Sequence, residues 1–376
     1  MPQFFASTAR GLVDVLGDEL KDMGFDQIKK DIGGVFFETN WAGCYKANLN
    51  SRLASRILKP VLDFPAYQPE ELYNNILKHD FTKYITADQT IAVEASVHES
   101  MMRDQRFLAM KVKDAIVDQF RDKFGKRPSV DNDHAHLRVH IKGFKNQYHV
   151  AVDTSGSSLF QRGYRTEQGV APLKENLAAG LVLLAGWDKK QPLVDFMCGS
   201  GTILIEAAMM VLNIAPGIHR KGFAFQSWKG FDKSVWEDIV QHAVDAELSE
   251  APVKIYGFDA DFKVIKMAKE NSRNAGTDKI IEFKKEQIAL VENPEAQPGL
   301  IIVNPPYGAR IGEEEELRDV YRDMGYILKN KFKGWDCWIL SGNKDLIMDL
   351  KLKSTRKIFL FNGQIECRFL KYSINQ

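Results

Sequence analysis

The sequence has few cysteines and no long hydrophobic run. Its four cysteines lie far apart and form no CxxC pair, which argues against a disulfide framework and against a thiolate zinc site. No apolar stretch reaches the roughly 18 residues that a membrane span needs, and the first residues lack the charge order of a signal peptide. We therefore expect a cytoplasmic protein with reduced thiols and no metal centre.

The sequence also lacks an excess of charge of either sign. Its 51 lysines and arginines stand against 50 aspartates and glutamates, which gives a formal net charge of +1. This balance neither indicates nor excludes a polyanionic partner, so any surface for nucleic acid must be local. At 376 residues, the chain is long enough for two or three domains.

The first 154 residues alternate short β-type runs with amphipathic stretches. From Phe4 to Pro60 the pattern predicts strand, helix, strand and helix, the last helix covering 44–58. Residues 65–154 predict a second α+β unit with a long helix at 107–125. This unit is locally basic, which suits contact with phosphates, although a solvated surface is the alternative for any one residue. Its candidate nucleic-acid contacts are Arg103, Arg106, Lys111, Lys126, Arg127, Lys142 and Lys145.

From Pro192 onward, short apolar runs alternate with stretches of helical length. This rhythm is typical of βαβ units and a parallel sheet. Near the end of the chain, Asn362-Gly363 separates two alternating runs, which is the strongest short-range signal for a β-hairpin. The sequence therefore predicts an α/β fold whose parallel sheet ends in an antiparallel hairpin.

The segment DFMCGSGT, from Asp195 to Thr202, predicts a nucleotide-binding loop. Asp195 ends an apolar strand, Gly199 and Gly201 allow a sharp turn, and an apolar helix follows. A purely structural turn is the alternative, and the third glycine of a dinucleotide fingerprint is missing. Asp259 ends the next predicted strand, where a carboxylate can accept hydrogen bonds from two ribose hydroxyls. A helix cap would look the same.

The most specific motif is Asn304-Pro305-Pro306-Tyr307, which follows the apolar run LIIV. Two consecutive prolines cannot continue a strand, so the chain must leave the sheet at its carboxyl edge, where open α/β sheets bind ligands. The Asn304 side-chain oxygen and the Pro305 carbonyl can accept both N–H bonds of an exocyclic amine, and the Tyr307 ring can stack on the base. The motif predicts methylation of a base amino group; a buried turn with a core tyrosine is the alternative.

Together these motifs resemble those of RNA methyltransferases that join a THUMP RNA-binding domain to a Rossmann-like catalytic domain, in particular the bacterial 23S rRNA guanine N2-methyltransferases. The resemblance extends along nearly the whole chain, from FFASTARGLVDVLGDEL through FQRGYR, APLKENLAAGLVLLAGW, DFMCGSGTILIEAA, IAPG, GFDAD and NPPYG to FNGQIECRFLKY. It implies a ferredoxin-like domain at 1–64, a THUMP domain at 65–154, a linker and cofactor-lid segment at 155–190, and a seven-stranded Rossmann-like methyltransferase domain at 191–376.

The resemblance also implies residue roles. Asp195 and the two glycines of the loop would contact the methionine moiety of S-adenosylmethionine, and Asp259 would hold its ribose. Glu286 stands where the family often has aspartate and would contact the adenine; a surface carboxylate is the alternative. The candidate cofactor contacts are Asp195, Cys198, Gly199, Gly201, Thr202, Asp259, Glu286, Asn304, Arg165, Pro172 and Asn176, the last three from the predicted lid. The candidate catalytic residues are Asn304, Pro305, Pro306 and Tyr307.

Other functions fit part of the pattern. A tRNA guanine N2-methyltransferase would share every motif, and an adenine N6-methyltransferase would present an amine to the same acceptors. A binding-only RNA chaperone could keep the fold without the chemistry, whereas a Rossmann dehydrogenase would need GxGxxG and has no use for NPPY. The THUMP-like unit favours folded RNA over DNA, with the target nucleotide unstacked or flipped into the pocket.

Overall fold

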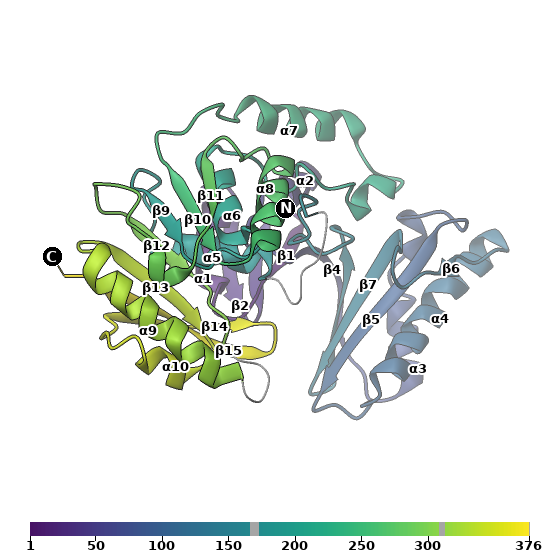
Figure 1. The fold of residues 1–376 in the computed structure, drawn as a ribbon. Coiled ribbons are helices and arrows are strands. Elements are labelled where there is room, and N and C mark those ends of the chain that lie inside the picture. Colours follow the sequence, from purple (N-terminus) through teal and green to yellow (C-terminus); the bar gives the residue numbers. More distant parts are fainter. Residues whose placement is uncertain (166–172, 308–312, 376) are drawn as a thin grey trace.

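The computed structural model describes residues 1–165, 173–307 and 313–375 (Figure 1). They form two sheets. The N-terminal sheet has eight strands in the order β2-β3-β1-β4-β8-β7-β5-β6, and the C-terminal sheet has seven in the order β11-β10-β9-β12-β13-β15-β14. Within these ranges, no helix combines the length and apolar character needed to cross a membrane.

The first unit differs from its expected pattern in two places. It contains β1 (Gln3–Ser7), α1 (Val13–Asp22), β2 (Asp26–Asp31), β3 (Gly34–Glu38), α2 (Trp41–Asn50) and β4 (Arg56–Pro65). β2 was not expected, because its sequence DQIKKD is polar and almost wholly exposed. The helix expected over 44–58 is wrong beyond Asn50, because residues from Arg56 onward pair with β1 and β8. Pairing on both edges outweighs the helical pattern there.

The second unit continues the same sheet. It contains α3 (Pro69–Ile76), a 3-10 turn η1 (Phe81–Lys83), β5 (Thr90–His98), α4 (Gln105–Phe124), β6 (Ser129–Val130), β7 (Leu137–Phe144) and β8 (Gln147–Asp153). Helix α4 starts at Asp104, whose side chain accepts hydrogen bonds from two backbone N–H groups, and ends at Gly125 in the left-handed conformation. Strand β4 pairs with β8 from Leu58 to Pro65, so the two units share one sheet.

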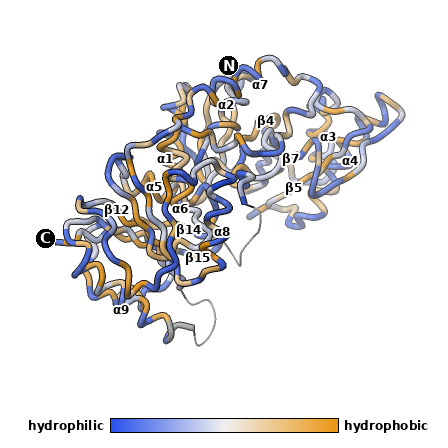
Figure 2. Tube along the Cα trace, turned by 45° about the horizontal axis from the view of Figure 1, so that its top comes forward, coloured by the Kyte–Doolittle hydropathy of each residue, from blue (hydrophilic) through white to orange (hydrophobic). Residues whose placement is uncertain are grey.

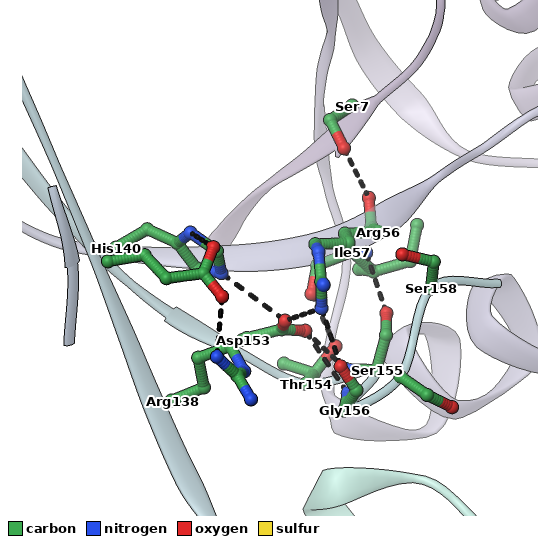
Figure 3. Close-up of polar contacts among 12 residues, drawn as sticks. Ser7, Arg56, Ile57, Arg138, His140, Asp153, Thr154, Ser155, Gly156 and Ser158 are labelled. Carbon is green, nitrogen blue, oxygen red and sulfur yellow. Dashed lines mark hydrogen bonds and ion pairs between the residues drawn. The ribbon is translucent and has the colours of Figure 1, made fainter. Parts of the chain in front are cut away.

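Buried polar residues hold the seam between these units (Figure 3). Asp153 is fully buried; it forms an ion pair with Arg56 and accepts the Ser155 N–H at 2.8 Å. The His140 Nε2 lies 3.3 Å from the same carboxylate. Burial alone would raise the pKa of Asp153, but the hydrogen bond from His140 and the charge of Arg56 lower it below its usual value. The seam therefore carries a paired, ionised carboxylate.

The C-terminal half forms the predicted α/β sheet. Its strands are β9 (Leu193–Asp195), β10 (Ile255–Asp259), β11 (Ile281–Lys285), β12 (Leu300–Val303), β13 (Asp336–Ser341), β14 (Arg356–Asn362) and β15 (Ile365–Ser373). Strands β9 to β13 pair in parallel, and β15 runs antiparallel between β13 and β14. The predicted fold class, including the seven-stranded sheet and its closing hairpin, is confirmed.

Helices surround this sheet and attach it to the first unit. They are α5 (Glu175–Ala185), α6 (Thr202–Val211), α7 (Lys233–Asp245), α8 (Phe262–Asn274), α9 (Glu313–Lys331) and α10 (Lys344–Met348), with 3-10 turns η2 (Ala224–Ser227) and η3 (Ile288–Leu290). Figure 2 shows hydrophobic residues gathered along α5, α6 and β12. Gly180 of α5 lies so close to Leu12 that a Cβ there would be 2.6 Å from its side chain. One hydrophobic core thus runs from the first unit into the C-terminal sheet.

A buried ion pair joins the same two regions. Arg162 is 1% exposed and Glu206, on α6, is 0% exposed, with Nη2 3.4 Å from Oε2. The guanidinium also donates to the carbonyls of Ser51 and Arg52 in the first unit. Tyr164 donates its hydroxyl to Glu206 at 3.2 Å. Both charges are therefore satisfied inside the protein.

Replacing this carboxylate should be strongly destabilising. Glu206→Gln leaves the Arg162 charge buried without a counter-ion, so we expect the free energy of unfolding to fall by about 3 kcal/mol, measured by urea denaturation at pH 7. The matched control is Glu237→Gln, which breaks the exposed Lys233 pair and should leave the urea midpoint unchanged. Equal midpoints for the two variants would contradict the role given to Arg162.

Candidate active site

The loop between β9 and α6 depends on glycine. Gly199 and Gly201 adopt φ values of 55° and 83°, in the left-handed region that favours glycine. A Cβ on Gly201 would also lie 3.0 Å from the Phe283 ring of β11. The turn favours glycine at both positions, and the close approach to β11 requires it at Gly201.

Two carboxylates meet at this loop. Asp259, at the end of β10, accepts the Gly199 N–H on Oδ2 and the Asp261 N–H on Oδ1, each at 3.0 Å. Asp195, at the end of β9, is buried and accepts the Met197 N–H at 3.0 Å. Burial raises the pKa of Asp195 to about 8, against the opposing hydrogen bond from Met197. The structure thus brings together Asp195, the glycine loop and Asp259, as the sequence predicted.

Glu286 and Cys198 are tied to the same edge through their backbones. The Glu286 N–H donates to the Asp259 carbonyl at 3.0 Å, so this half-buried residue sits one strand further along. The Cys198 N–H donates to the Phe258 carbonyl at 2.9 Å. Burial raises the pKa of the Cys198 thiol well above its usual value, so it stays protonated. Cys198 therefore serves this edge by its backbone and not as a nucleophile.

The NPPY motif leaves the sheet at β12, beside β9. The Tyr307 hydroxyl donates to the Asn304 Oδ1 at 2.9 Å and accepts the Asn362 Nδ2–H at 3.0 Å. The Tyr321 hydroxyl donates to the Pro306 carbonyl at 3.2 Å. Burial raises the pKa of Tyr307, which keeps its hydroxyl protonated as the donor. The motif is therefore held by the C-terminal hairpin.

Asn362 and Asn343 are site residues that the sequence analysis missed. Asn362 holds the Tyr307 hydroxyl, and the Asn343 Nδ2 lies 3.5 Å from the Tyr307 carbonyl. The only sequence signal for Asn362 was its place in the Asn-Gly hairpin turn. That signal predicts the backbone conformation of the turn and not a side-chain contact with a residue 55 positions away.

Arg165 of the predicted lid reaches the start of α6. Its Nη2 donates to the Thr202 Oγ1 and to the Leu173 carbonyl, each at 2.7 Å. Its Nε lies 3.3 Å from Glu175. Burial raises the pKa of Glu175 to about 7, although the charge of Arg165 opposes this shift. Arg165 and Thr202 thus lie together next to the glycine loop.

The other two predicted lid residues are placed differently. The Asn176 Nδ2 donates to the Ser55 Oγ at 3.1 Å and to the Leu53 carbonyl at 3.3 Å, both in the first unit. Within the described ranges, Asn176 makes no hydrogen bond to the glycine loop. Its assignment to the cofactor therefore stays a prediction. Pro172 lies outside the described residues.

The basic residues predicted for RNA cover the surface of the second unit. Lys126 pairs with Asp88, and Lys145 lies 3.8 Å from Glu99. Lys111 is half-buried against the Tyr73 ring. The exposed residues for which the described part of the chain offers no carboxylate partner are Arg103, Arg106, Arg127 and Lys142. Exposed apolar side chains lie near them in the sequence, namely Met101, Phe107, Met110 and Phe144. Over the described ranges, no cluster of three His, Cys, Asp or Glu side chains could hold a metal ion.

Three family models match the chain. The RlmL ferredoxin-like domain matches residues 3–58, the THUMP domain matches 66–153, and the RMKL-like methyltransferase domain matches 162–371. The last of these covers more than half of the chain. The chain belongs to the RMKL-like methyltransferase family. Along the chain, the three matches follow one another in the order ferredoxin-like, THUMP and methyltransferase.

Relatives within the family fall into two lengths. A putative RNA methyltransferase of Synechocystis is 39% identical, and the match covers 99% of this chain and 96% of that protein. The ribosomal RNA large subunit methyltransferases K/L of Syntrophotalea carbinolica and Methylococcus capsulatus are 38% and 40% identical. Those matches cover 99% of this chain but 53% and 51% of the relatives. The chain spans about half the length of the K/L relatives that it matches.

Solved structures of similar chains share the whole architecture. SMU.472, a putative methyltransferase complexed with SAH, has a TM-score of 0.90 at 32% identity over 100% of this chain and 98% of that one. A predicted N6-adenine-specific DNA methylase from Listeria monocytogenes also has a TM-score of 0.90 at 32% identity, over 99% and 96%. TrmN from Thermus thermophilus, at 18% identity and a TM-score of 0.72, shares the fold.

The buried carboxyl of Asp195 should make stability depend on pH. Its pKa of about 8 lies above the value of about 3.9 expected in the unfolded chain, so the folded state holds a proton that the unfolded state has lost. The stability that this proton provides is complete below about pH 4 and is lost as the pH rises to about 8. Asp195→Asn mimics the neutral acid at every pH. The difference in melting temperature between this variant and the wild type should therefore grow in favour of the variant as the pH rises from about 5 to 8.

The measurement is the melting temperature without ligand at pH 5, 7 and 9. The exposed Asp278→Asn is the control and should show no such trend. A constant difference between Asp195→Asn and the wild type at all three values would contradict the raised pKa.

Proposed function

We propose that the chain is an S-adenosylmethionine-dependent methyltransferase that modifies the exocyclic N2 of a guanosine in 23S rRNA. The observation that carries this proposal is the meeting of two sites at one edge. The strands β10, β9 and β12 are neighbours, so the carboxylate-lined glycine loop and the NPPY motif lie at their adjoining carboxyl ends. The names of the K/L relatives and the SAH in SMU.472 support it.

The donor set of the loop fits S-adenosylmethionine, which supplies an electrophilic methyl group when bound. Each oxygen of Asp259 accepts one backbone N–H and keeps lone pairs for the ribose hydroxyls. Asp195, protonated in the site without ligand, would ionise beside the positive charge of the methionine ammonium and pair with it, while Glu286, just past the end of β11, can contact the adenine. Thr202 and Arg165 close the other side of the loop.

The NPPY motif orients the amine that receives the methyl group. The Asn304 Oδ1 and the Pro305 carbonyl accept hydrogen bonds from its two N–H groups, which favours a pyramidal nitrogen whose lone pair is less conjugated with the ring and can point at the methyl group. Tyr307 keeps Asn304 in place by its hydrogen bond and offers its ring to the base. The amine loses its proton to solvent after the transfer, so no residue has to act as a general base.

The second unit docks the RNA in this proposal. Its exposed arginines and lysines would contact phosphates of a folded RNA, and the target nucleotide would flip out to reach Tyr307. An rRNA substrate places the proposed activity in the cytoplasm. The domain limits that we assign are 1–64 for the ferredoxin-like domain, 65–154 for the THUMP domain, 155–190 for the linker and lid, and 191–376 for the methyltransferase domain.

The name of the Listeria relative supplies a second candidate. That protein is called a predicted N6-adenine-specific DNA methylase, and an adenine amine suits the same two acceptors of the NPPY motif. A guanosine in tRNA is a third substrate with identical chemistry. The K/L names and the THUMP match favour rRNA over both.

Transfer of labelled methyl from S-adenosylmethionine should distinguish these substrates. We expect N2-methylguanosine in 23S rRNA that lacks the modification, and none in similarly unmodified tRNA or in double-stranded DNA, as read by nucleoside digestion and mass spectrometry. N2-methylguanosine in tRNA alone would show that the substrate is tRNA and not 23S rRNA, and N6-methyladenosine would show that the methylated base is adenine. A lack of label in all three would count against the proposed chemistry.

Variants of the NPPY motif and of the cofactor loop should affect different quantities, the first the turnover rate and the second the affinity for S-adenosylmethionine. Asn304→Ala removes an acceptor of the reacting amine, so we expect kcat to fall by roughly 100-fold or more with the Kd for S-adenosylmethionine nearly unchanged. Asp259→Ala should do the opposite, weakening cofactor binding by roughly tenfold or more. Calorimetry and single-turnover rates measure the two effects. Equal losses of affinity and rate in both variants would contradict the assigned roles.

A further inference from the structure

A cavity of about 460 Å³ lies between the first unit, helix α5 and the C-terminal hairpin. Its lining includes Arg10, Ser55, Lys174, Asn176, Leu177 and Phe361. Its size falls within the range of roughly 300 to 1,000 Å³ that holds small organic ligands. Among the lining residues, Asn176 was predicted above to contact the cofactor, but its side chain makes its hydrogen bonds to the first unit.

The charge of the cavity has one sign. Arg10 comes from the first unit and Lys174 from the start of α5, and no carboxylate is among the lining residues. In the part of the chain that the structure describes, neither cation has a carboxylate partner. Each lies over an aromatic ring instead, Arg10 at 5.4 Å from the centre of Phe361 and Lys174 at 4.8 Å from that of Phe160. A ring does not neutralise a cation, so the two charges remain available to an anion.

The wall also contains an incomplete polar group. Asn176 is 1% exposed, and its Nδ2 donates to Ser55. Its Oδ1 has no hydrogen-bond partner within the described ranges. A buried acceptor without a partner is costly. A hydroxyl or amino group of a ligand in the cavity would supply the missing donor.

The cavity is held in shape by a close backbone contact. Gly11 has a φ of 91°, and a Cβ there would lie 2.6 Å from the Phe359 carbonyl oxygen of β14. The loop that carries Arg10 therefore packs directly against the hairpin that carries Phe361. This contact fixes the two walls relative to each other without a bound ligand.

The same hairpin leads to the proposed base pocket. Phe361 and Gly363 line the cavity, and Asn362 between them donates to the Tyr307 hydroxyl. One hairpin turn thus presents neighbouring residues to the cavity and to the NPPY motif. Successive side chains of a strand point to opposite faces, so only this hairpin turn would separate a group bound in the cavity from a base held at Tyr307.

We propose that this cavity binds the nucleotide adjacent to the methylated guanosine, with its phosphate between Arg10 and Lys174. The proposal rests on the RNA methyltransferase function given above. A ribose hydroxyl of that nucleotide supplies the donor for Asn176, and Phe361 and Leu177 give its sugar and base an apolar surface. The cavity thereby holds the strand on one side of the flipped base, which positions the guanine amine at Asn304.

The test compares Arg10→Gln/Lys174→Gln with the wild type. Binding of transcribed 23S rRNA is measured over a salt series, and the slope of log Kd against log salt should fall by roughly 0.7 for each phosphate that the variant no longer neutralises. The KM for RNA should rise roughly tenfold, while the Kd for S-adenosylmethionine stays the same. The matched control is Lys279→Gln/Lys333→Gln, two exposed lysines that precede β11 and β13 at the opposite edge of the sheet. It should change neither value.

Inorganic phosphate separates an RNA site from a site for a free anion. A slope and a KM equal to those of the control variant would overturn the proposal. The proposal would also be overturned by a second result, in which inorganic phosphate raises the melting temperature of the wild type but not of the double variant, and the salt slope for RNA is the same in both proteins. Failure of the wild type to methylate RNA would contradict the proposed function instead, because the salt series measures binding alone.

Discussion

The buried pair of Arg162 and Glu206 is the interaction on which the arrangement of the domains depends. Glu206 belongs to the helix that begins at the glycine loop, and Arg162 stands three residues before Arg165, which contacts that loop. The same guanidinium reaches carbonyls of the first unit. Hydrophobic contacts are non-directional, whereas the hydrogen bonds of this guanidinium require one geometry. A single buried charge thereby relates the first unit to the catalytic loop.

Much of the fold could be predicted because its signals are local. The catalytic strands are short apolar runs between helical stretches, and the Asn-Gly turn marks the final hairpin. β2 escaped prediction because an exposed strand of polar residues has no buried face to reveal it. The helix expected over 44–58 was wrong past Asn50, because pairing with two distant strands decides the structure there. Such pairing cannot be derived from periodicity.

The same distinction holds for the candidate site. Asp195, Asp259 and the NPPY motif each end a strand, so their meeting follows from the parallel order of the sheet. Asn362 and Asn343 could not be found in this way, because only the folded hairpin and the end of β13 bring them to Tyr307. The cavity between the first unit and the hairpin could not be predicted from the sequence either. Its two cations, Arg10 and Lys174, are separated by most of the N-terminal half of the chain and meet only in the folded protein. The direction of Asn176, toward the first unit, is likewise a result of domain packing.

Strand β4 belongs to both N-terminal units, pairing with β1 on one edge and β8 on the other. Bending at β4 would break its pairing with β8, and the Trp228 Nε1–H donates to the His136 carbonyl at 2.9 Å, which ties the second unit to the C-terminal half. The basic surface of the second unit and the catalytic edge are therefore kept at a set separation. If RNA docks on that surface as proposed, the fold would select a guanosine by its distance from the docked part of the RNA as well as by its chemistry.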